Sequence, residues 1–596
     1  MQTYNKREDV PTKYKWDLSP FYKNANEFEK EYEEAKKLNS EISKYKGTLK
    51  DSNKLYNFLN DNLKIGIMLD NLYVYSILKD DEVLGIPSSI ERKEKVWSLI
   101  AQNYINTSFY EPEILSFTEK EYSSLFNNDK LLRYKVHLDE IYRYKKHVLS
   151  EKEEQIIESL SMACNKYEDM SSVMLNSLND YGKVKIDGKD TVITTTNYRK
   201  LTKNKDRKKR KEIRNKFSKV INQYSALSAL YLGSYVNLNK EEKRLRNYKS
   251  AFDAKLFSLN MPKEAYDSLV KTVEKNAKLY QKYLKIFKDV HGFKELYPYD
   301  LNLELTKNDI EYSIEDAKKL CLNAIKPLGK DYYLKFKKIF DNRYIDFIGY
   351  KGKCSGGYSA STATNDSRIL MSYNYDLDSV STIIHEGGHN VHHQYVMENN
   401  DVMYRSVSTL VSEVASLTNE CLLSNYLMKH GKNKEEKLSG IANIINVISS
   451  NLFGAVREGK IEQDFYEYVE SGNTITDEYL NKLTIDSLKL YYGSEVKLDD
   501  YSKLGWIRRS HYYSNFYLYS YAFSISVATY VASEIIDGNN DMLDKYLKFL
   551  KTGADKYPYD VFKIIGIDLT DDKVYKKALN YYDNLLNEFE KIRKEW

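Results

Sequence analysis

Apolar residues recur at i, i+3 and i+4 along most of this 596-residue chain, with charged residues between them. This spacing is typical of helices that bury one face. Only eight prolines occur, and none lies between Pro112 and Pro262 or between Pro327 and Pro558. Because proline interrupts the interior of a helix, the pattern predicts a mainly α fold.

One departure from this pattern is the segment "KVKIDGKDTVITT", residues 183–195. Valine and isoleucine alternate with lysines up to the turn pair Asp187-Gly188, and a β-branched run follows. Alternation around such a turn predicts a short β-hairpin. We place a domain boundary here, between an N-terminal helical domain over residues 1–195 and a second helical domain over residues 196–596.

A second departure lies further along the chain. Gly352, Gly356 and Gly357 predict a flexible loop before a strand-like stretch, Arg368–Asn374. This stretch leads directly into "STIIHEGGHNVHHQYV", residues 381–396. That short segment contains four of the nine histidines of the chain.

Composition fits a soluble globular protein, with 42% apolar and 30% charged residues. The 91 basic and 86 acidic side chains nearly cancel, so composition gives no case for a nucleic-acid partner. The basic run at residues 199–217 is interpreted as a solvated helix face, because Asp206 can cap the helix and Lys208 can pair with Glu212.

The chain starts with charged residues and has no uninterrupted apolar run of about 18 residues. We therefore expect no membrane partner and a cytoplasmic location. The cysteines are scattered and form no CxxC pair, which predicts neither a disulfide framework nor a cysteine-rich zinc site. They are Cys164, Cys321, Cys354 and Cys421.

The histidine cluster is predicted to lie on a helix that starts near Asp376. His385 and His389 then project from one side, one turn apart, where both imidazoles can reach a tetrahedral Zn²⁺ at ~2.0–2.1 Å. Glu386 follows the first histidine and completes an HExxH pattern, in which the carboxylate accepts a proton from the attacking water. This chemistry is hydrolysis of an amide. The alternative is a chance match among surface histidines.

Other histidines and the glycines of this segment have different interpretations. His392 and His393 lack a carboxylate in the required place, so we interpret them as packing or supporting groups. Gly387 and Gly388 each cost about 0.8–1 kcal/mol against alanine inside a helix. We therefore expect a neighbouring backbone, from a packed helix or from substrate, to approach closely there.

A catalytic zinc needs a third protein ligand. Glu398 is too far along the same helix to reach back easily. In "STLVSEVASLTNECLLSNYL", Glu413 and Glu420 are seven residues apart and share one face of a second predicted helix. We assign Glu413 to the metal and Glu420 to orienting an imidazole. The alternative is a pair of solvated glutamates.

Several motifs, in order and spacing, resemble one known family. They are "REDVPTKYKWDLSPFY", "RNYKSAFDA", "YPYDLNL", "GKCSGGYSA", "HEGGH", "SEVASLTNE" and "SHYYSNFYLYSYAFS". Together they resemble oligoendopeptidase F, of the thimet oligopeptidase family of zinc metallopeptidases, almost from end to end. The resemblance implies one Zn²⁺ per chain, held by His385, His389 and Glu413, with Glu386 as the general base.

The resemblance also implies a fold and further site residues. The fold would be a large helical zincin-type peptidase with a deep substrate channel and a small β-sheet beside the HExxH helix. The edge strand of that sheet, here Arg368–Asn374, would bind an extended peptide. Residues implied in catalysis or peptide binding are His511, Tyr519, Tyr513, Tyr517, Tyr373 and Gly357.

The expected activity is zinc-dependent hydrolysis of internal bonds in short oligopeptides. A carboxypeptidase or dipeptidyl carboxypeptidase of the same fold is the alternative, followed by a non-catalytic helical binding protein. Ser359 stands where the family commonly has a cysteine, so substrate preference could differ. The expected partners are short peptides, without nucleic acid or membrane, and the sequence leaves the oligomeric state open.

Overall fold

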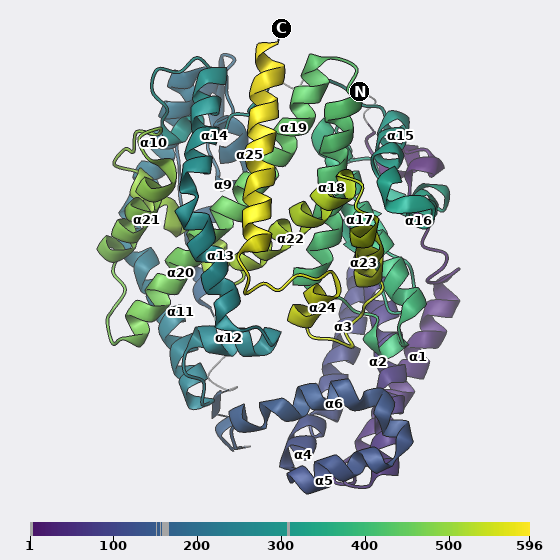
Figure 1. Ribbon diagram of the computed structural model, residues 1–596. Helices are drawn as coiled ribbons and strands as arrows, with labels where there is room; N and C mark the ends of the chain where they lie inside the picture. Colours follow the sequence, from purple (N-terminus) through teal and green to yellow (C-terminus); the bar gives the residue numbers. More distant parts are fainter. Residues whose placement is uncertain (1–3, 151, 155, 158–165, 307–309, 596) are drawn as a thin grey trace. The chain divides into compact units, whose positions relative to one another are not determined.

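The computed structural model describes residues 4–150, 152–154, 156–157, 166–306 and 310–595. Helices dominate this part of the chain, and its strands form one two-stranded and one three-stranded sheet (Figure 1). The mainly α fold class is therefore confirmed. Within the described residues, Cys321, Cys354 and Cys421 form no disulfide, whereas Cys164 lies outside them.

The chain divides into two compact units, each assembled from three segments. Unit 1 comprises Met1–Lys146, Asp309–Tyr426 and Val531–Gly566, and unit 2 comprises His147–Asn308, Leu427–Tyr530 and Ile567–Trp596. Neither unit begins or ends at residue 195. The domain boundary expected between residues 195 and 196 therefore stays a prediction.

The helices of unit 1 are α1 (Ala25–Glu41), α2 (Ser52–Glu82), α3 (Pro87–Thr107), α4 (Tyr110–Ser116), α5 (Glu119–Ser124), α6 (Lys135–Tyr142), α15 (Ile314–Ala324), α16 (Gly329–Asp341), α17 (Leu377–Asn399), α18 (Thr409–His430), α23 (Asn540–Leu550) and α24 (Pro558–Ile564). Of α18, most residues but not the last ones belong to unit 1. The first three pack on one another through buried leucines and aromatic rings. Asp51 starts α2, because its carboxylate accepts the amide hydrogens of Asn53 and Lys54.

The sheet of unit 1 has the strand order β3 (Ile345–Asp346), β5 (Arg368–Leu370), β4 (Tyr358–Ala360). β5 pairs parallel with β3 and antiparallel with β4, so it is the central strand. The expectation that Arg368–Asn374 forms the edge strand is therefore wrong. Only the first three of those residues are in the sheet, and β4 is the edge strand beside β5.

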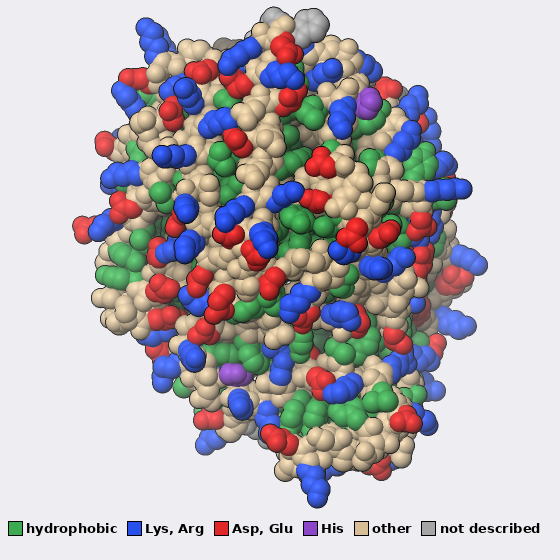
Figure 2. All heavy atoms as spheres, viewed as in Figure 1, with side chains coloured by type: hydrophobic (Ala, Val, Ile, Leu, Met, Phe, Trp, Pro, Cys, Tyr) green, Lys and Arg blue, Asp and Glu red, His purple; other side chains and the backbone are tan. Residues whose placement is uncertain are grey.

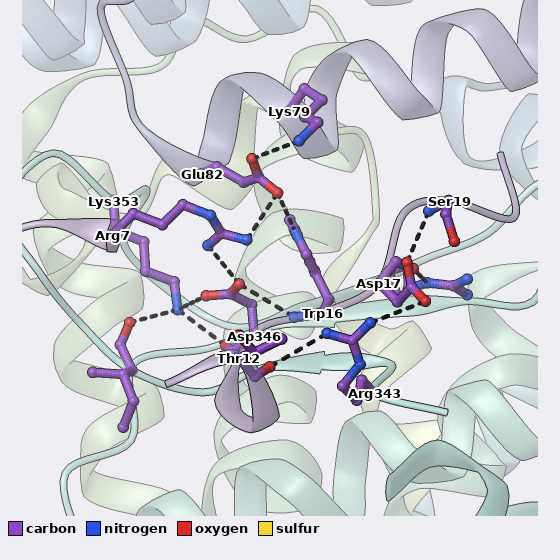
Figure 3. Close-up of polar contacts among 12 residues, drawn as sticks. Arg7, Thr12, Trp16, Asp17, Ser19, Lys79, Glu82, Arg343, Asp346 and Lys353 are labelled. Atoms are coloured by element: carbon purple, nitrogen blue, oxygen red, sulfur yellow. Dashed lines mark hydrogen bonds and ion pairs between the residues drawn. The ribbon is translucent and has the colours of Figure 1, made fainter. Parts of the chain in front are cut away.

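A buried polar network fixes the β3 side of this sheet (Figure 3). The Arg7 guanidinium lies between Glu82 at 2.8 Å and Asp346 at 2.6 Å, and Lys353 pairs with the other oxygen of Asp346 at 2.8 Å. The indole of Trp16 also donates to Glu82 at 2.8 Å. Because Lys353 lies in the glycine-rich loop before β4, the network holds that loop against the sheet.

The helices of unit 2 are α8 (Tyr167–Asn176), α9 (Thr195–Leu201), α10 (Arg207–Gln223), α11 (Ser225–Leu245), α12 (Ala251–Leu259), α13 (Lys263–Lys275), α14 (Ala277–Val290), α19 (Lys434–Ile448), α20 (Ala455–Glu470), α21 (Asp477–Tyr492), α22 (Leu518–Ile536) and α25 (Lys573–Lys594). Of α22, most residues but not the last ones belong to unit 2. The long helix α25 packs along α19 and α14 (Figure 1).

The predicted hairpin is confirmed in unit 2 as β1 (Lys183–Ile186) and β2 (Lys189–Val192), paired antiparallel. Asp187 and Gly188 have φ angles of 49° and 80°. Two successive positive φ angles are what a two-residue turn of type I′ requires, which explains the Asp-Gly pair.

The basic run forms α9 and α10 and uses several of its charges internally. Asp206 caps α10 as predicted, by accepting the amide hydrogen of Lys208 at 2.8 Å. Glu212 pairs with Lys209 and with Lys216, each at 3.0 Å. These two lysines take the place of Lys208, the partner predicted for Glu212. The buried Arg210 donates to the buried carboxylate of Asp300 at 2.7 Å. These contacts favour a structural role for the run.

Charge is well mixed on the molecular surface in view. Figure 2 shows Lys and Arg side chains interspersed with Asp and Glu. Among the described residues, one helical stretch, Lys434–Glu470, is long and apolar enough to cross a bilayer by length and composition. Of its apolar window 67% is buried inside the protein, as in the core helix of a soluble protein.

Candidate active site

The histidine cluster lies on α17, which starts where the sequence predicts. Asp376 caps the helix by accepting the amide hydrogen of Ser379 at 2.9 Å. The helix then continues without interruption to Asn399. Its regular turn places His385 and His389 on one side, with ring centroids 5.0 Å apart.

Glu413, on α18, completes a group of three donors with these two histidines. Its Oε2 lies 3.6 Å from Nε2 of His385 and 3.8 Å from Nε2 of His389. One donor atom from each residue lies within 4.8 Å of the others, and no other such group of three occurs in the described parts of the chain. Ligands at about 2.0–2.2 Å around a tetrahedral ion are separated by about 3.3–3.6 Å, so the donors fit zinc with small adjustments.

Glu420 lies next to the first histidine, and its role in orienting that imidazole stays a prediction. Its Oε1 lies 2.6 Å from Nδ1 of His385, and its Oε2 accepts from the Ser381 hydroxyl at 3.1 Å. Burial lowers the pKa of His385, but the hydrogen bond and charge of Glu420 outweigh it and raise the pKa to about 9. With Nδ1 held by Glu420, Nε2 is left to face the third donor, which is how a carboxylate fixes a metal-binding imidazole.

Burial decides the protonation behaviour of the other two groups on this helix face. It raises the pKa of Glu386 to about 7, with the charge of Glu413 adding to the shift. It lowers the pKa of His389 to about 3, which keeps that imidazole neutral at neutral pH. A neutral imidazole can ligate a metal, and a carboxyl group that titrates near neutrality can take up and release a proton.

The glycine pair allows the close helix packing that the sequence predicts. A Cβ added to Gly388 would lie 2.8 Å from Cα of Ser416 and 2.9 Å from the carbonyl oxygen of Ala415, both on α18. A Cβ on Gly387 would overlap the ring of Phe336 on α16. The two glycines therefore let α17 approach α16 and α18, and so bring Glu413 to the histidines.

An additional bridge stabilises this packing. The Asn419 amide donates to the carbonyl oxygen of Ile384 at 3.1 Å and accepts from the Tyr332 hydroxyl at 2.9 Å. His392 and His393 pack as expected. The ring of His392 stacks near Phe549, and His393 lies 3.2 Å from the carbonyl oxygen of Asn365.

A cavity of ≈ 750 Å³ in unit 1 opens beside the metal group. His389 and Glu413 line it together with Ser359 of the edge strand β4 and with Arg405. Gly357 lies just before β4, and a Cβ there would meet Thr382 at 3.1 Å and the carbonyl oxygen of Leu370 at 3.7 Å. A peptide-contacting role for Gly357 stays a prediction.

Tyr373 does not support the role predicted for it. Its side chain is only 5% exposed, and its hydroxyl donates to the carbonyl oxygen of Tyr312 at 3.0 Å. The residue follows β5 rather than an exposed edge, which explains why it is packed inside instead of presented to a peptide.

The remaining predicted site residues belong to unit 2, and two of them, His511 and Tyr517, form a group with Tyr521. The ring of His511 lies 6.2 Å from the ring of Tyr517 and 6.1 Å from that of Tyr521. The two tyrosine rings lie 5.3 Å apart, edge to face. Burial lowers the pKa of His511, with Arg509 adding to the shift.

Tyr519 and Tyr513 point elsewhere. Tyr519 is 1% exposed and packs among Phe252, Tyr266 and Phe523. A substrate contact by Tyr519 is therefore not supported. Tyr513 is half-buried and packs edge to face on Tyr235, with centroids 5.2 Å apart.

Tyr521 is not among the residues predicted from the sequence, although its ring belongs to the His511 group. α22 begins at Leu518, so Tyr517 and Tyr521 are four residues apart at its start and share one face. Tyr519 lies between them and projects into the core. The i, i+4 spacing was the available signal, but it selects this pair only when the start of the helix is known.

The segment that carries His511 has an unusual backbone held by buried partners. Asn515 and Phe516 have φ angles of 40° and 59°. The Asn515 side chain accepts from the hydroxyls of Tyr235 and Tyr466, each at 2.9 Å. The amide of Phe516 donates to Glu462 at 2.7 Å. Asparagine adopts positive φ more readily than most residues, whereas a bulky residue such as phenylalanine rarely does so unless its surroundings hold it there.

Residues 200–581 match peptidase family M3, and residues 113–178 match the family described as Oligopeptidase F. The first match covers more than half of the chain. The chain belongs to peptidase family M3.

Relatives extend the M3 match to the whole chain. Oligopeptidase PepF of Bacillus subtilis (strain 168) is 30% identical over 590 residues, which cover 98% of this chain and 88% of the relative. A solved structure from Chlamydophila abortus has a TM-score of 0.92 at 25% identity, covering 99% of this chain and 100% of that one. The oligoendopeptidase-F of Enterococcus faecium has a TM-score of 0.74 at 25% identity, covering 96% and 99%. The M3 assignment confirms the resemblance seen in the motifs, and the chain is a peptidase.

Proposed function

We propose that this M3 peptidase is a zinc-dependent oligoendopeptidase that hydrolyses internal bonds of short oligopeptides. The observation that carries the proposal is the three-donor group of His385, His389 and Glu413 beside the buried carboxyl group of Glu386. Two imidazoles and one carboxylate favour zinc on ligand chemistry, with one ion per chain.

When bound, zinc would act as a Lewis acid that polarises the peptide carbonyl and makes water a stronger nucleophile. Glu386 would accept the proton of the attacking water and return it to the leaving amine, which suits a carboxyl group whose pKa is raised to about 7. Glu420 would keep Nε2 of His385 directed at the ion.

The proposal also includes hydrogen-bond donors to the oxygen that becomes negative in the reaction. The resemblance gives this role to His511 and to tyrosines of the same segment. We keep His511 and Tyr517 and replace Tyr519 by Tyr521, because those three rings form one group whereas Tyr519 is buried. Preorganised donors of this kind stabilise developing charge without reorganisation.

The names of the relatives favour an endopeptidase over a carboxypeptidase. Those from Bacillus subtilis and Enterococcus faecium are named as an oligopeptidase and an oligoendopeptidase, respectively. The proposal includes a cytoplasmic location and short peptides as partners, with no role for nucleic acid or membrane. The mixed surface charge and the internal pairing of the basic run support it.

The test is hydrolysis of an internally quenched peptide of about ten residues that is blocked at both ends. Purified protein is assayed as isolated, after treatment with a chelator, and after zinc is restored. Cleavage that disappears with the chelator and returns with zinc supports the proposal. Cleavage only of peptides with a free carboxyl end would instead identify a carboxypeptidase.

The base is tested with Glu386→Gln. The loss of a general base lowers kcat by about 10²–10⁴-fold, and zinc content should stay at one ion per chain. Glu398→Gln is the matched control, because Glu398 is on the same helix but 55% exposed and paired with Lys335. Zinc-bound wild type that cleaves no peptide would contradict the peptidase mechanism and favour a binding role.

A further inference from the structure

A second cavity, of ≈ 190 Å³, lies entirely within unit 2 and has an unusual lining. Four arginines contribute to its wall: Arg214 from α10, Arg457 from α20, and Arg508 and Arg509 from the segment before His511. We call it the arginine cleft. It is distinct from the metal group, all of whose donors are in unit 1.

The carboxylates at the arginine cleft are too few for its guanidinium groups. Glu458 is shared by Arg457 at 2.6 Å and Arg509 at 3.2 Å, and it also accepts from the Tyr512 hydroxyl at 2.6 Å. Arg214 pairs with Asp499 at 2.5 Å. Among the described residues, two carboxylates thus pair with these guanidinium groups, which leaves two of the four positive charges without a counter-charge.

Arg508 shows where the surplus lies. Its guanidinium is held over the rings of Tyr198 at 4.5 Å and Phe217 at 4.7 Å. No ion pair involves it among the described residues. Burial lowers the pKa of Arg508 and the charge of Arg509 adds to this, as expected for a cation beside another cation. The Nε of Arg509 is itself buried and has no hydrogen-bond partner in the described part of the chain.

We infer that the arginine cleft binds a small, doubly charged oxyanion of the phosphate type. Guanidinium forks match the oxygens of such an anion, and the two aromatic rings hold the Arg508 fork in a fixed plane. A volume of ≈ 190 Å³ is several times the ~30 Å³ share of one water, which is enough for a tetrahedral oxyanion. Two charges on the anion match the two uncompensated cations, whereas a monocarboxylate would leave one.

The cleft is also joined to the segment that carries His511. Glu458 bonds to Arg509 on one side of His511 and to Tyr512 on the other. Binding of an anion is nevertheless independent of catalysis, so its test does not depend on the proposed function.

The test is a calorimetric titration of the zinc-loaded full chain with inorganic phosphate. The ionic strength is held constant with sodium chloride. We expect saturable binding by the wild type and binding at least about tenfold weaker for Arg508→Gln, since one charge-assisted bond is lost. Acetate, with one charge, should bind at least about tenfold more weakly than phosphate.

Arg244→Gln is the matched control. Arg244 is 65% exposed on α11, pairs with Glu241 and does not line the cleft, so this variant loses the same charge without changing the site. Phosphate affinity should be unchanged in it. Arg508→Lys keeps the charge but not the fork, and it should also bind at least about tenfold more weakly. Far-UV circular dichroism checks that each variant is folded.

Three results would overturn the inference. Phosphate binding that is undiminished in both folded Arg508 variants would place the anion elsewhere, for example on the zinc. An equal loss of phosphate affinity in Arg244→Gln would show that phosphate is held by non-specific charge attraction. Absence of saturable binding by the wild type would show that the surplus charge has no ligand of this class.

Discussion

The metal group of unit 1 and the His511 segment of unit 2 are built in different ways. His385, Glu386 and His389 lie on one uninterrupted helix, and Glu413 and Glu420 lie on another. His511 instead precedes two residues with positive φ, and its tyrosine neighbours lie at the beginning of α22. A helix fixes side-chain directions by its own period, whereas the His511 segment depends on the buried partners around it.

The strongest way to break the metal group is to push its two helices apart with Gly388→Ala. The new methyl group would lie 2.8 Å from Cα of Ser416 and 2.9 Å from the carbonyl oxygen of Ala415, neither of which can move alone. Overpacking of this kind costs about 3 kcal/mol. We expect a lower thermal midpoint together with weaker zinc binding, measured by calorimetry and metal analysis.

Gly66→Ala is the control for this substitution. Gly66 is inside α2, has an ordinary helical φ, and a Cβ there meets nothing within 4 Å. Alanine should raise the stability slightly at Gly66, by about 0.5–1 kcal/mol. Equal midpoints for both variants would show that the glycine pair does not determine the distance between α17 and α18.

The His511 segment is probed most directly by removing one hydroxyl at a time. Tyr521→Phe should lower kcat by about a hundredfold with little change in stability, if its hydroxyl donates to the developing oxyanion. Tyr519→Phe is the matched control, because the hydroxyl of Tyr519 is buried and has no hydrogen-bond partner among the residues that the structure describes. A larger loss of kcat in Tyr519→Phe than in Tyr521→Phe would reverse the assignment.

Much of the metal group could be predicted from the sequence, and the reason is periodicity. The four-residue spacing in HEGGH and the seven-residue spacing from Glu413 to Glu420 need only a regular helix to set their faces, and the structure provides both helices. The glycine pair likewise indicated close neighbours, which are α16 at Gly387 and α18 at Gly388.

The sheet order and the tyrosines could not be predicted in the same way. A strand signal at Arg368 says nothing about which strand is central, because that depends on β3 and β4 from other parts of the chain. Choosing Tyr521 over Tyr519 required the exact start of α22, which follows a segment with two positive φ angles. Local pattern determines neither feature.

Removal of the carboxylate that supports the metal group is expected to have a smaller effect on zinc binding. Glu420→Gln removes the charge that holds Nδ1 of His385 at 2.6 Å, and loss of such a partner lowers metal affinity by about 10–100-fold. Competition with a chromophoric chelator measures the change. Glu398→Gln, at the far end of the same unit's α17, should bind zinc as tightly as the wild type. Unchanged affinity in Glu420→Gln would mean that the charge of Glu420 is not needed to orient the imidazole.

The smallest expected effect concerns how the His511 segment is held at different pH values. Glu462 accepts the amide hydrogen of Phe516, and burial raises its pKa from 4.5 to about 8. A carboxyl group that is protonated in the folded state contributes stability fully below pH 4.5 and loses it as pH rises through 8. The thermal midpoint of the wild type should therefore fall by a few degrees relative to that of Glu462→Gln between pH 5 and pH 8.

The exposed Glu467, further along the same helix, provides the control Glu467→Gln, which should follow the wild type. A constant difference between wild type and Glu462→Gln across this range would show that Glu462 is already charged when it binds Phe516, and that the segment is held by a carboxylate rather than by a neutral acid.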